Sequence, residues 1–164
     1  YSLFTFRKGT SVVIAREEDH MLTGQYQRSL DSKSRVTLPV IMRKQFGETV
    51  MLVPWKDALH GFTPEAFETW ENNLGLNPRN REDNDALLYL NSMTTTVEID
   101  SAGRVALGKI DETARGHRER LGLDGDLMVV GAGDHFEIWN AERWNAKFKP
   151  EDAAEKFESL FFVD

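Results

Sequence analysis

The sequence of 164 residues contains no cysteine. A disulfide framework and a metal site built on thiolates are therefore excluded, and a reducing compartment such as the cytoplasm is the natural expectation. No apolar run approaches the length that a bilayer-spanning helix needs, and residues 1–20 lack the order of a signal peptide. These absences favour a cytoplasmic protein that has no membrane partner.

Motifs of catalysis and cofactor binding are missing as well. The sequence has no Gly-x-Ser-x-Gly elbow and no phosphate-binding Gly-rich lysine motif, and its carboxylates are scattered. The histidines show no metal-ligand spacing, and two of them occupy nearly matching strand positions, which favours a structural role; the four are His20, His60, His117 and His135. We therefore expect no enzyme, no cofactor, no metal ion and no small-molecule substrate.

Acidic residues outnumber basic ones and give a formal net charge of -7. Such an excess argues against nucleic acid as a partner, because phosphate binding depends on Lys and Arg side chains. The charge is unevenly distributed, however. Most charged residues of the segment 137–164 are acidic, whereas residues 28–44 carry a single acid, Asp31. The bases of that segment are Arg28, Lys33, Arg35, Arg43 and Lys44. A basic patch on an acidic body therefore remains possible.

One short turn occurs twice in the chain. Residues 30–39 read LDSKSRVTLP and residues 99–108 read IDSAGRVALG, so both contain Asp-Ser, two variable positions and Arg-Val-x-Leu. The match extends along both halves in the order strand, turn, strand, helix, strand, strand, helix. Thr63 and Asn140, each followed two positions later by a glutamate, predict N-caps of matching helices. The chain is therefore predicted to contain two similar repeats.

The repeats divide the chain into segments. Residues 109–122 predict one longer helical segment of the second half, and Pro150 predicts the start of a C-terminal helix. The predicted boundaries are 1–20 for an N-terminal extension or leader, 21–76 for the first repeat, 77–93 for a linker helix, 94–149 for the second repeat and 150–164 for the C-terminal helix.

The repeated turn predicts an arginine on the solvent side of a tight hairpin. The side chain of Asp31 or Asp100 can accept bonds from backbone N–H groups farther along, which closes an Asx-type turn. Alternation then sends Arg35 and Arg104 outward. Each arginine could simply pair with the Asp four residues earlier, a pair worth about 0 to 1 kcal/mol. The duplication favours DNA contact, because guanidinium groups bind phosphate and read guanine. The residues predicted to point inward are Val36, Leu38, Val105 and Leu107.

Three stretches of the sequence resemble the bacterial MraZ transcriptional regulators, which are built from two AbrB-like (SpoVT/AbrB) halves. These are MLTGQYQRSLDSKSRVTLP, EIDSAGRVALG and LMVVGAGDHFEIWNAERW. The resemblance implies an α+β fold, specifically a pseudo-twofold double-split β-barrel of two swapped-hairpin repeats with flanking helices. It also implies a ring-like homo-oligomer on tandem repeats of double-stranded promoter DNA. Such a protein would sit on the nucleoid and usually repress the cell-division and cell-wall gene cluster, including its own operon.

The resemblance also assigns residues. The DNA-contacting arginines of the family fall on Arg35 and Arg104, with Lys33 as the neighbouring base. Ser34 stands where the family usually has Gly, and at a positive φ it would cost on the order of 1 kcal/mol. Ala102 takes the place of Lys33 in the second turn, so we expect the first turn to bind more strongly. The predicted DNA-binding set is Ser32, Lys33, Ser34, Arg35, Gly103 and Arg104.

Other functions compete with this one. An AbrB-like, antitoxin-like interaction module would use the acidic C-terminal helix to engage another protein, and an enzyme would need a buried cluster that the sequence does not display. Residues 109–122 could be a basic recognition helix, but their acids favour a solvated face. The tryptophans are predicted to pack in the core rather than to stack on bases; they are Trp55, Trp70, Trp139 and Trp144.

Overall fold

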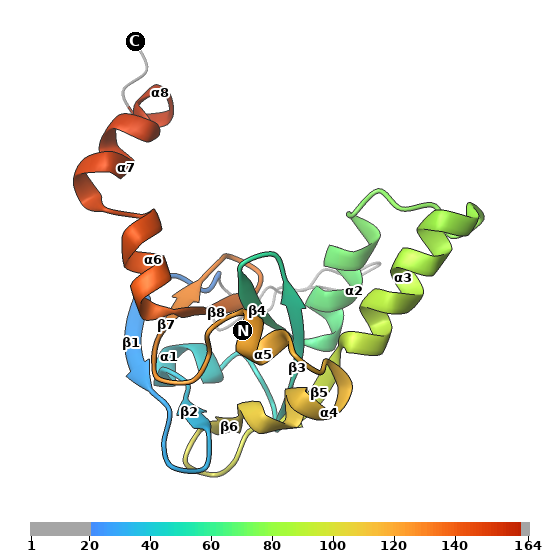
Figure 1. The fold of residues 1–164 in the computed structure, drawn as a ribbon, viewed down its shortest axis with the longest axis horizontal. Helices are drawn as coiled ribbons and strands as arrows, with labels where there is room; N and C mark the ends of the chain where they lie inside the picture. The colour runs from blue at the N-terminus through green and yellow to red at the C-terminus, as the bar shows by residue number, and fades with distance from the viewer. Residues whose placement is uncertain (1–20, 162–164) are drawn as a thin grey trace, which may run out of the picture.

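The fold is built around a six-stranded antiparallel sheet (Figure 1). The structure is a computed structural model that describes residues 21–161, so the predicted extension at residues 1–20 lies outside the described residues. The strand order is β1-β7-β8-β4-β3-β5, in which strands of the two halves are interleaved, and neither half forms this sheet alone. The strands are β1 Gln25–Ser29, β3 Thr49–Trp55, β4 Ala58–Phe62, β5 Thr95–Glu98, β7 Asp126–Gly131 and β8 Phe136–Asn140.

A second sheet consists of only two strands, β2 (Arg35–Thr37) and β6 (Arg104–Ala106), which pair antiparallel. Val36 lies opposite Val105 in the register, and neither side chain is exposed. The leucines that follow, Leu38 and Leu107, are buried in the same core cluster. The prediction that alternation turns these four residues inward is therefore confirmed.

The strands that flank each repeated turn do not behave as the predicted tight hairpin. β1 pairs with β7 along its full length, and β2 pairs with β6, so the first turn joins strands of two different sheets. In the second half a single bridge, between Ile99 and Val105, connects the two sides of the turn. Long-range pairing prevails because it lets the apolar faces of both halves share one core.

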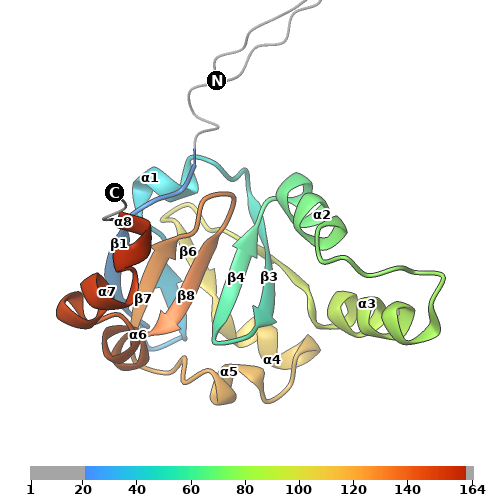
Figure 2. The ribbon, with the colours of Figure 1, turned by 90° about the horizontal axis from the view of Figure 1, so that it is seen from above.

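Helices pack around this framework. Figure 2 shows α2 and α3 beside β3 and β4, and α6 beside β7 and β8. The predicted N-caps are confirmed, since Thr63 accepts from the N–H of Ala66 at 3.1 Å and Asn140 accepts from that of Arg143 at 2.9 Å. The helices are α1 Val40–Arg43, α2 Pro64–Asn72, α3 Arg81–Met93, the 3₁₀ turn η2 Leu107–Lys109, α4 Ile110–Thr113, α5 His117–Arg120, α6 Ala141–Lys147, α7 Pro150–Lys156 and α8 Glu158–Phe161.

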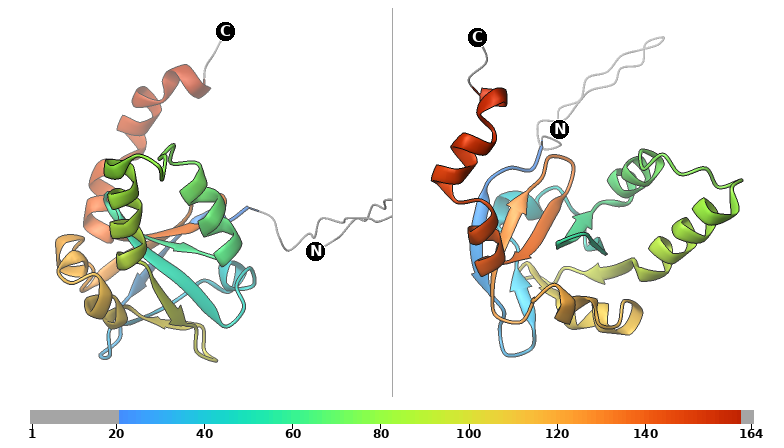
Figure 3. Two further views of the ribbon diagram at one scale, coloured as in Figure 1. Left: turned by 90° about the vertical axis from the view of Figure 1, so that its right-hand side faces the viewer. Right: turned by 45° about the horizontal axis from the view of Figure 1, so that its top comes forward.

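Two predicted helices are interrupted. The segment 109–122 is not one helix, because the chain leaves the helical region at Ala114 and Gly116 adopts a φ of 85°, which separates α4 from α5. The C-terminal helix begins at Pro150 as predicted but breaks at Phe157, where α7 gives way to α8. No residue of α7 is buried, and Figure 3 shows α7 and α8 extending away from the sheets.

The core has three clusters of buried side chains. The largest lies between the six-stranded sheet and the β2–β6 ribbon, and the two smaller ones lie under the helices on the other face. The four tryptophans belong to those smaller clusters, as predicted, with Trp55 edge-on to Trp70 and Trp139 edge-on to Trp144. The mixture of helices and antiparallel strands confirms the α+β class. Among the described residues, every helix is too short or too polar to cross a membrane.

Candidate nucleic-acid interface

The first repeated turn is closed by the carboxylate of Asp31. Its Oδ1 accepts from the backbone N–H groups of Lys33 and Arg35, both at 2.9 Å, and the backbone of Ser34 donates to the Asp31 carbonyl at 3.0 Å. The other carboxylate oxygen, Oδ2, accepts from Nε of Arg35 at 2.7 Å. One aspartate therefore fixes both the backbone of the turn and, at Nε, the guanidinium group of the arginine.

The second turn repeats this geometry. Oδ1 of Asp100 accepts from the backbone N–H groups of Ala102 at 3.0 Å and Arg104 at 2.8 Å, and Oδ2 accepts from Nε of Arg104 at 2.8 Å. Backbone bonds then link the turns reciprocally: the N–H of Leu38 donates to the carbonyl of Gly103, and the N–H of Leu107 donates to that of Ser34, both at 2.9 Å. The two turns thus form one rigid unit around the β2–β6 ribbon.

The carboxyl groups of Asp31 and Asp100 should have unusually low pKa values. The backbone N–H of Arg35 holds the pKa of Asp31 below its ordinary value of 3.8, with further help from the Arg35 side chain, and Arg104 does the same for Asp100. A lowered folded-state pKa adds stability above the unfolded pKa, and this stability is lost as the pH falls through the folded-state pKa. We expect carboxyl ¹³C NMR titration to give values under 3.8 for both residues.

The same titration has a built-in variant control. Because the backbone bond is the main cause, Asp31 should keep a pKa below 3.8 in Arg35→Met, where the side-chain bond is lost and the backbone bond remains. A pKa at or above 3.8 for Asp31 in the unaltered chain would contradict the bonding described here.

Positive backbone angles shape both turns at the position before the arginine. Ser34 has a φ of 57° and Gly103 a φ of 83°, so the first turn does place a serine in the left-handed region that glycine prefers. The turns differ in their surroundings, because a Cβ at Gly103 would overlap with the guanidinium of Arg43. A side chain at this position of the second turn would therefore require Arg43 to move.

Ser34→Gly should stabilise the protein. Relief of the left-handed strain is worth about 0.5–1 kcal/mol in the free energy of unfolding, which urea denaturation followed by tryptophan fluorescence can measure. The opposite change in the second turn, Gly103→Ser, should destabilise by at least this amount, because it introduces the same strain and displaces the Arg43 side chain. A loss of stability in Ser34→Gly would mean that the serine side chain makes a compensating contact.

Both arginines lie on the outer face of the β2–β6 ribbon. Arg35 lies opposite Ala106 and Arg104 opposite Thr37, so the two guanidinium groups stand diagonally across one strand pair, on the face away from Val36 and Val105. Their side chains are 27% and 37% exposed. Among residues 21–161, neither arginine has a hydrogen-bond partner for Nη1 or Nη2. The intramolecular pairing anticipated from the sequence occupies Nε and leaves the outer nitrogens for a ligand.

The tips of the turns are the most accessible part of this surface. Ser32, Lys33 and Ala102 are exposed, and in Figure 1 the blue loop before β2 and the yellow loop before β6 both project from the lower edge of the molecule. The six predicted DNA-binding residues are thereby brought together, with Ser34 half-buried and Gly103 buried under Arg43.

The charge around the arginines is mixed. Arg35 and Arg104 border one surface hollow of about 520 Å³, which Lys109 shares with three acids, Glu98, Asp100 and Glu112. Within the basic segment, Arg28 donates to the carbonyl of Thr37 at 3.2 Å and Arg43 lies against Gly103, so two of its five bases serve the fold. The exposed bases of this segment are Lys33, at the tip of the first turn, and Lys44.

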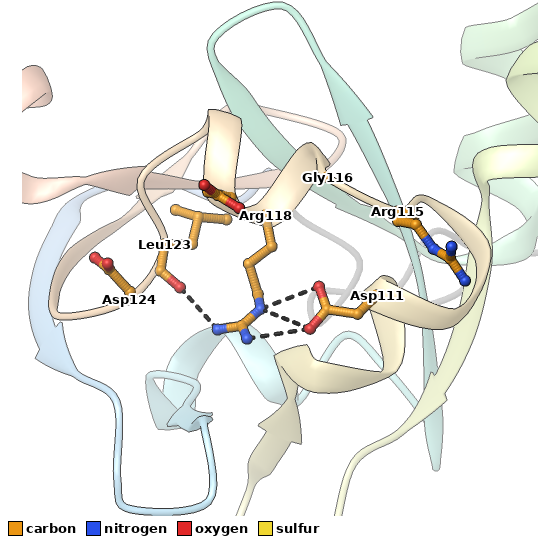
Figure 4. Close-up of a pocket in the computed structure, with 7 residues that line it drawn as sticks. Asp111, Arg115, Gly116, Arg118, Leu123 and Asp124 are labelled. Atoms are coloured by element: carbon orange, nitrogen blue, oxygen red, sulfur yellow. Dashed lines mark hydrogen bonds and ion pairs between the residues drawn. The ribbon is translucent and has the colours of Figure 1, made fainter.

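The α4–α5 segment is a poor recognition helix. Figure 4 shows the guanidinium of Arg118 directed at the carboxylate of Asp111 and at the carbonyl of Leu123. Nη2 donates to Oδ2 of Asp111 at 3.1 Å, and Nη1 donates to the Leu123 carbonyl, also at 3.1 Å. Arg115 points elsewhere. Since Arg118 is used internally and both helices are only 4 residues long, the interpretation of this segment as a solvated face is supported.

A cluster of two histidines and a glutamate lies away from the turns, and sequence spacing did not reveal it. His60 on β4 lies opposite Glu137 on β8. His135 is the residue before β8 and is two positions from Glu137, so both side chains lie on the same face of the sheet. Nδ1 of His60 is 3.0 Å from Nε2 of His135, which is 3.1 Å from Oε2 of Glu137. Cross-strand register creates this cluster, so separation along the chain could not predict it.

The protonation of the cluster follows from its surroundings. Burial lowers the pKa of His60 to about 4, so this ring is neutral and its Nε2–H donates to the carbonyl of Trp55 at 3.1 Å. Burial opposes the charge of His135 as well, but hydrogen bonds to Glu137 and Asp134 outweigh it and raise the pKa of that ring. Burial would raise the pKa of Glu137, yet the hydrogen bond from His135 keeps it lowered.

Comparison with known proteins places both halves of the chain in one family. The family model described as "MraZ protein, putative antitoxin-like" matches residues 21–89 and again residues 90–161. A protein of Ligilactobacillus salivarius named transcriptional regulator MraZ is 31% identical over 142 residues, which cover 85% of this chain and 94% of that protein. A protein of the same name from Limosilactobacillus reuteri is 34% identical over 81% of this chain and 90% of its own length. Another, from Heliobacterium modesticaldum, is 32% identical over 83% of this chain and 96% of its own length.

Proposed function

Because the chain belongs to the MraZ family, we propose that it is a transcriptional regulator that binds double-stranded DNA through its two repeated turns. The observation that supports this most is the placement of Arg35 and Arg104 on one face of the β2–β6 ribbon with their outer nitrogens unoccupied by residues 21–161. Membership also confirms the expectation that the chain is not an enzyme, since the matched relatives are named as transcriptional regulators.

The chemistry of the two arginines suits a duplex. Each guanidinium is held at Nε by its own aspartate, so little side-chain entropy is lost when Nη1 and Nη2 meet a phosphate or the O6 and N7 atoms of guanine. Lys33 adds a charge at the tip of the first turn, whereas Ala102 adds none at the second. Ser32 offers a hydroxyl to phosphate oxygens, and Ser34 and Gly103 set the backbone shape.

The finer architecture is part of the same proposal. The reciprocal bonds from Leu38 to Gly103 and from Leu107 to Ser34 support a pseudo-twofold arrangement of two swapped-hairpin repeats in a double-split barrel. The domain boundaries predicted from the sequence stay a prediction, with the repeats at 21–76 and 94–149.

A ring-like homo-oligomer would repeat the pair of turns along tandem promoter sites. Each subunit offers few contacts, so affinity would come from simultaneous binding of several subunits. Direct repeats spaced near one helical turn would present the same face of the duplex to successive subunits. In this proposal the protein acts in the cytoplasm on the nucleoid, as a repressor of the cell-division and cell-wall gene cluster that includes its own operon.

A salt titration on promoter fragments tests this function. Labelled DNA from upstream of the protein's own operon is titrated by fluorescence anisotropy at several salt concentrations, with a shuffled fragment of equal length as control. We expect the logarithm of the binding constant to fall linearly with the logarithm of salt, because phosphate contacts release counterions. Equal affinity for the shuffled fragment would refute sequence-specific binding, and no measurable binding would refute the function.

The exposed C-terminal helix favours one second candidate, the antitoxin-like interaction module. α7 has no buried residue and carries Glu151, Asp152 and Glu155 on an exposed surface. If this candidate holds, deletion of residues 150–164 should abolish capture of a basic protein partner and leave DNA binding unchanged. Loss of DNA binding on the same deletion would assign the helix to assembly of the DNA-binding oligomer instead.

A further inference from the structure

The His60–His135–Glu137 cluster has the shape of a metal site. Its three donor atoms, Nδ1 of His60, Nε2 of His135 and Oε2 of Glu137, are separated by 3.0, 3.1 and 3.6 Å. Zinc bonds of about 2.0–2.2 Å in a tetrahedron place neighbouring ligand atoms roughly 3.3–3.6 Å apart. Each observed separation lies within about 0.5 Å of that range, so small side-chain movements would complete the geometry.

The outer atoms of the three side chains are fixed in the manner of metal ligands. Nε2 of His60 is bonded to the carbonyl of Trp55, Nδ1 of His135 lies 2.7 Å from a carboxylate oxygen of Asp134, and Oε1 of Glu137 accepts from Nε1 of Trp139 at 2.9 Å. Such bonds set the histidine tautomers so that the lone pairs of the inner nitrogens face each other.

The packing around the cluster makes it preorganised and keeps it reachable. The ring of Phe62 stacks on His135 with 4.6 Å between centroids, and β4 and β8 run side by side in the sheet (Figure 2). The side chain of Glu137 is 21% exposed and that of the neighbouring Asp134 is 54% exposed, so the cluster lies close to the surface.

We propose that His60, His135 and Glu137 form a three-ligand site for a divalent transition metal ion, with Zn²⁺ as the preferred ion and a water molecule in the fourth position. Two imidazole nitrogens with one carboxylate oxygen match the ligands of known three-ligand zinc sites, and the donor set excludes a preference for Mg²⁺ or Ca²⁺, which favour oxygen. The ion would join β4 of the first half to β8 of the second.

Direct titration tests the site. The untagged full chain is treated with a chelator and titrated with Co²⁺, whose visible spectrum reports coordination, and then with Zn²⁺ against a chromophoric chelator. We expect one Co²⁺ per chain with the intense visible absorption of four-coordinate cobalt, and its displacement by one equivalent of Zn²⁺. Absence of saturable binding, or binding by Mg²⁺ equal to that by Zn²⁺, would overturn the proposal.

Variants separate this site from adventitious binding. Glu137→Gln and His135→Gln should weaken Zn²⁺ affinity about 100-fold or more, and Asp134→Asn, which alters only the support of His135, about 10- to 100-fold. His117→Gln, on α5, is the matched control and should bind as the unaltered chain does. If circular dichroism shows that the ligand variants do not fold, Asp134→Asn still tests the site, because Asp134 is exposed. Unchanged Zn²⁺ affinity in Asp134→Asn would contradict the site.

Discussion

Removal of both turn arginines should abolish DNA binding and leave the fold intact. Arg35→Ala combined with Arg104→Ala deletes the guanidinium groups that face outward from the β2–β6 ribbon, and each base or phosphate contact of this kind is worth about 1–3 kcal/mol. The double variant should therefore lose roughly 30- to 20,000-fold in affinity per subunit, and avidity in an oligomer would enlarge the loss. Gel shift on the promoter fragment measures it.

The single variants should be unequal. Arg35→Ala should cost more affinity than Arg104→Ala, because the first turn also carries Lys33 and the second carries Ala102 in its place. Arg79→Ala combined with Arg81→Ala is the matched control, since both residues are exposed and remove the same charge near the start of α3. Equal losses in the control pair and the turn pair would mean that net charge, and not the turns, governs binding.

Stability of the fold is expected to depend strongly on one glycine and one phenylalanine at the centre of the sheet. Gly61 on β4 and Phe136 on β8 are register partners, and the Phe136 ring occupies the space above the glycine, so a Cβ at Gly61 would lie within 3.0 Å of three ring carbons. Phe136→Ala should lower the free energy of unfolding by about 3–5 kcal/mol. Gly61→Val should cost about 1–3 kcal/mol or more through overpacking.

The two changes should partly compensate each other. In the double variant the valine enters the space left by the ring, so the combined loss should be smaller than the sum of the single losses, as urea denaturation can establish. Gly47→Ala is the control, because a Cβ there meets nothing within 4 Å and stability should change little. Additive losses would show that the ring and the glycine are not packed as described. A loss of 3–5 kcal/mol is large for a domain with a total stability of about 5–15 kcal/mol.

Local patterns in the sequence predicted the local structure well. The alternation after each turn correctly buried Val36 and Val105, and the polar residues Thr63 and Asn140 correctly marked helix starts. The glycine that the family usually has at the position of Ser34 pointed to a possible positive φ there, and Ser34 has a φ of 57°. These features depend on neighbours within a few residues, which a sequence displays directly.

Features that depend on distant pairing were not predictable. The pairing of β2 with β6 joins segments about seventy residues apart and replaces the expected hairpins. The meeting of His60 with Glu137 depends on the register between β4 and β8, which no spacing along the chain encodes. The break at Gly116 was missed because the helical pattern of apolar residues continues on both sides of that glycine.

The placement of both turns against DNA can be tested directly because the chain has no cysteine, so Ser32→Cys and Ala102→Cys each introduce a single thiol at the tip of one turn. Each variant, labelled with a photo-crosslinking group, is irradiated on the promoter fragment, with the exposed Glu142→Cys on α6 as control. The account predicts cross-links from both turns and none from α6. Cross-links from α6 alone, or from neither turn, would contradict it.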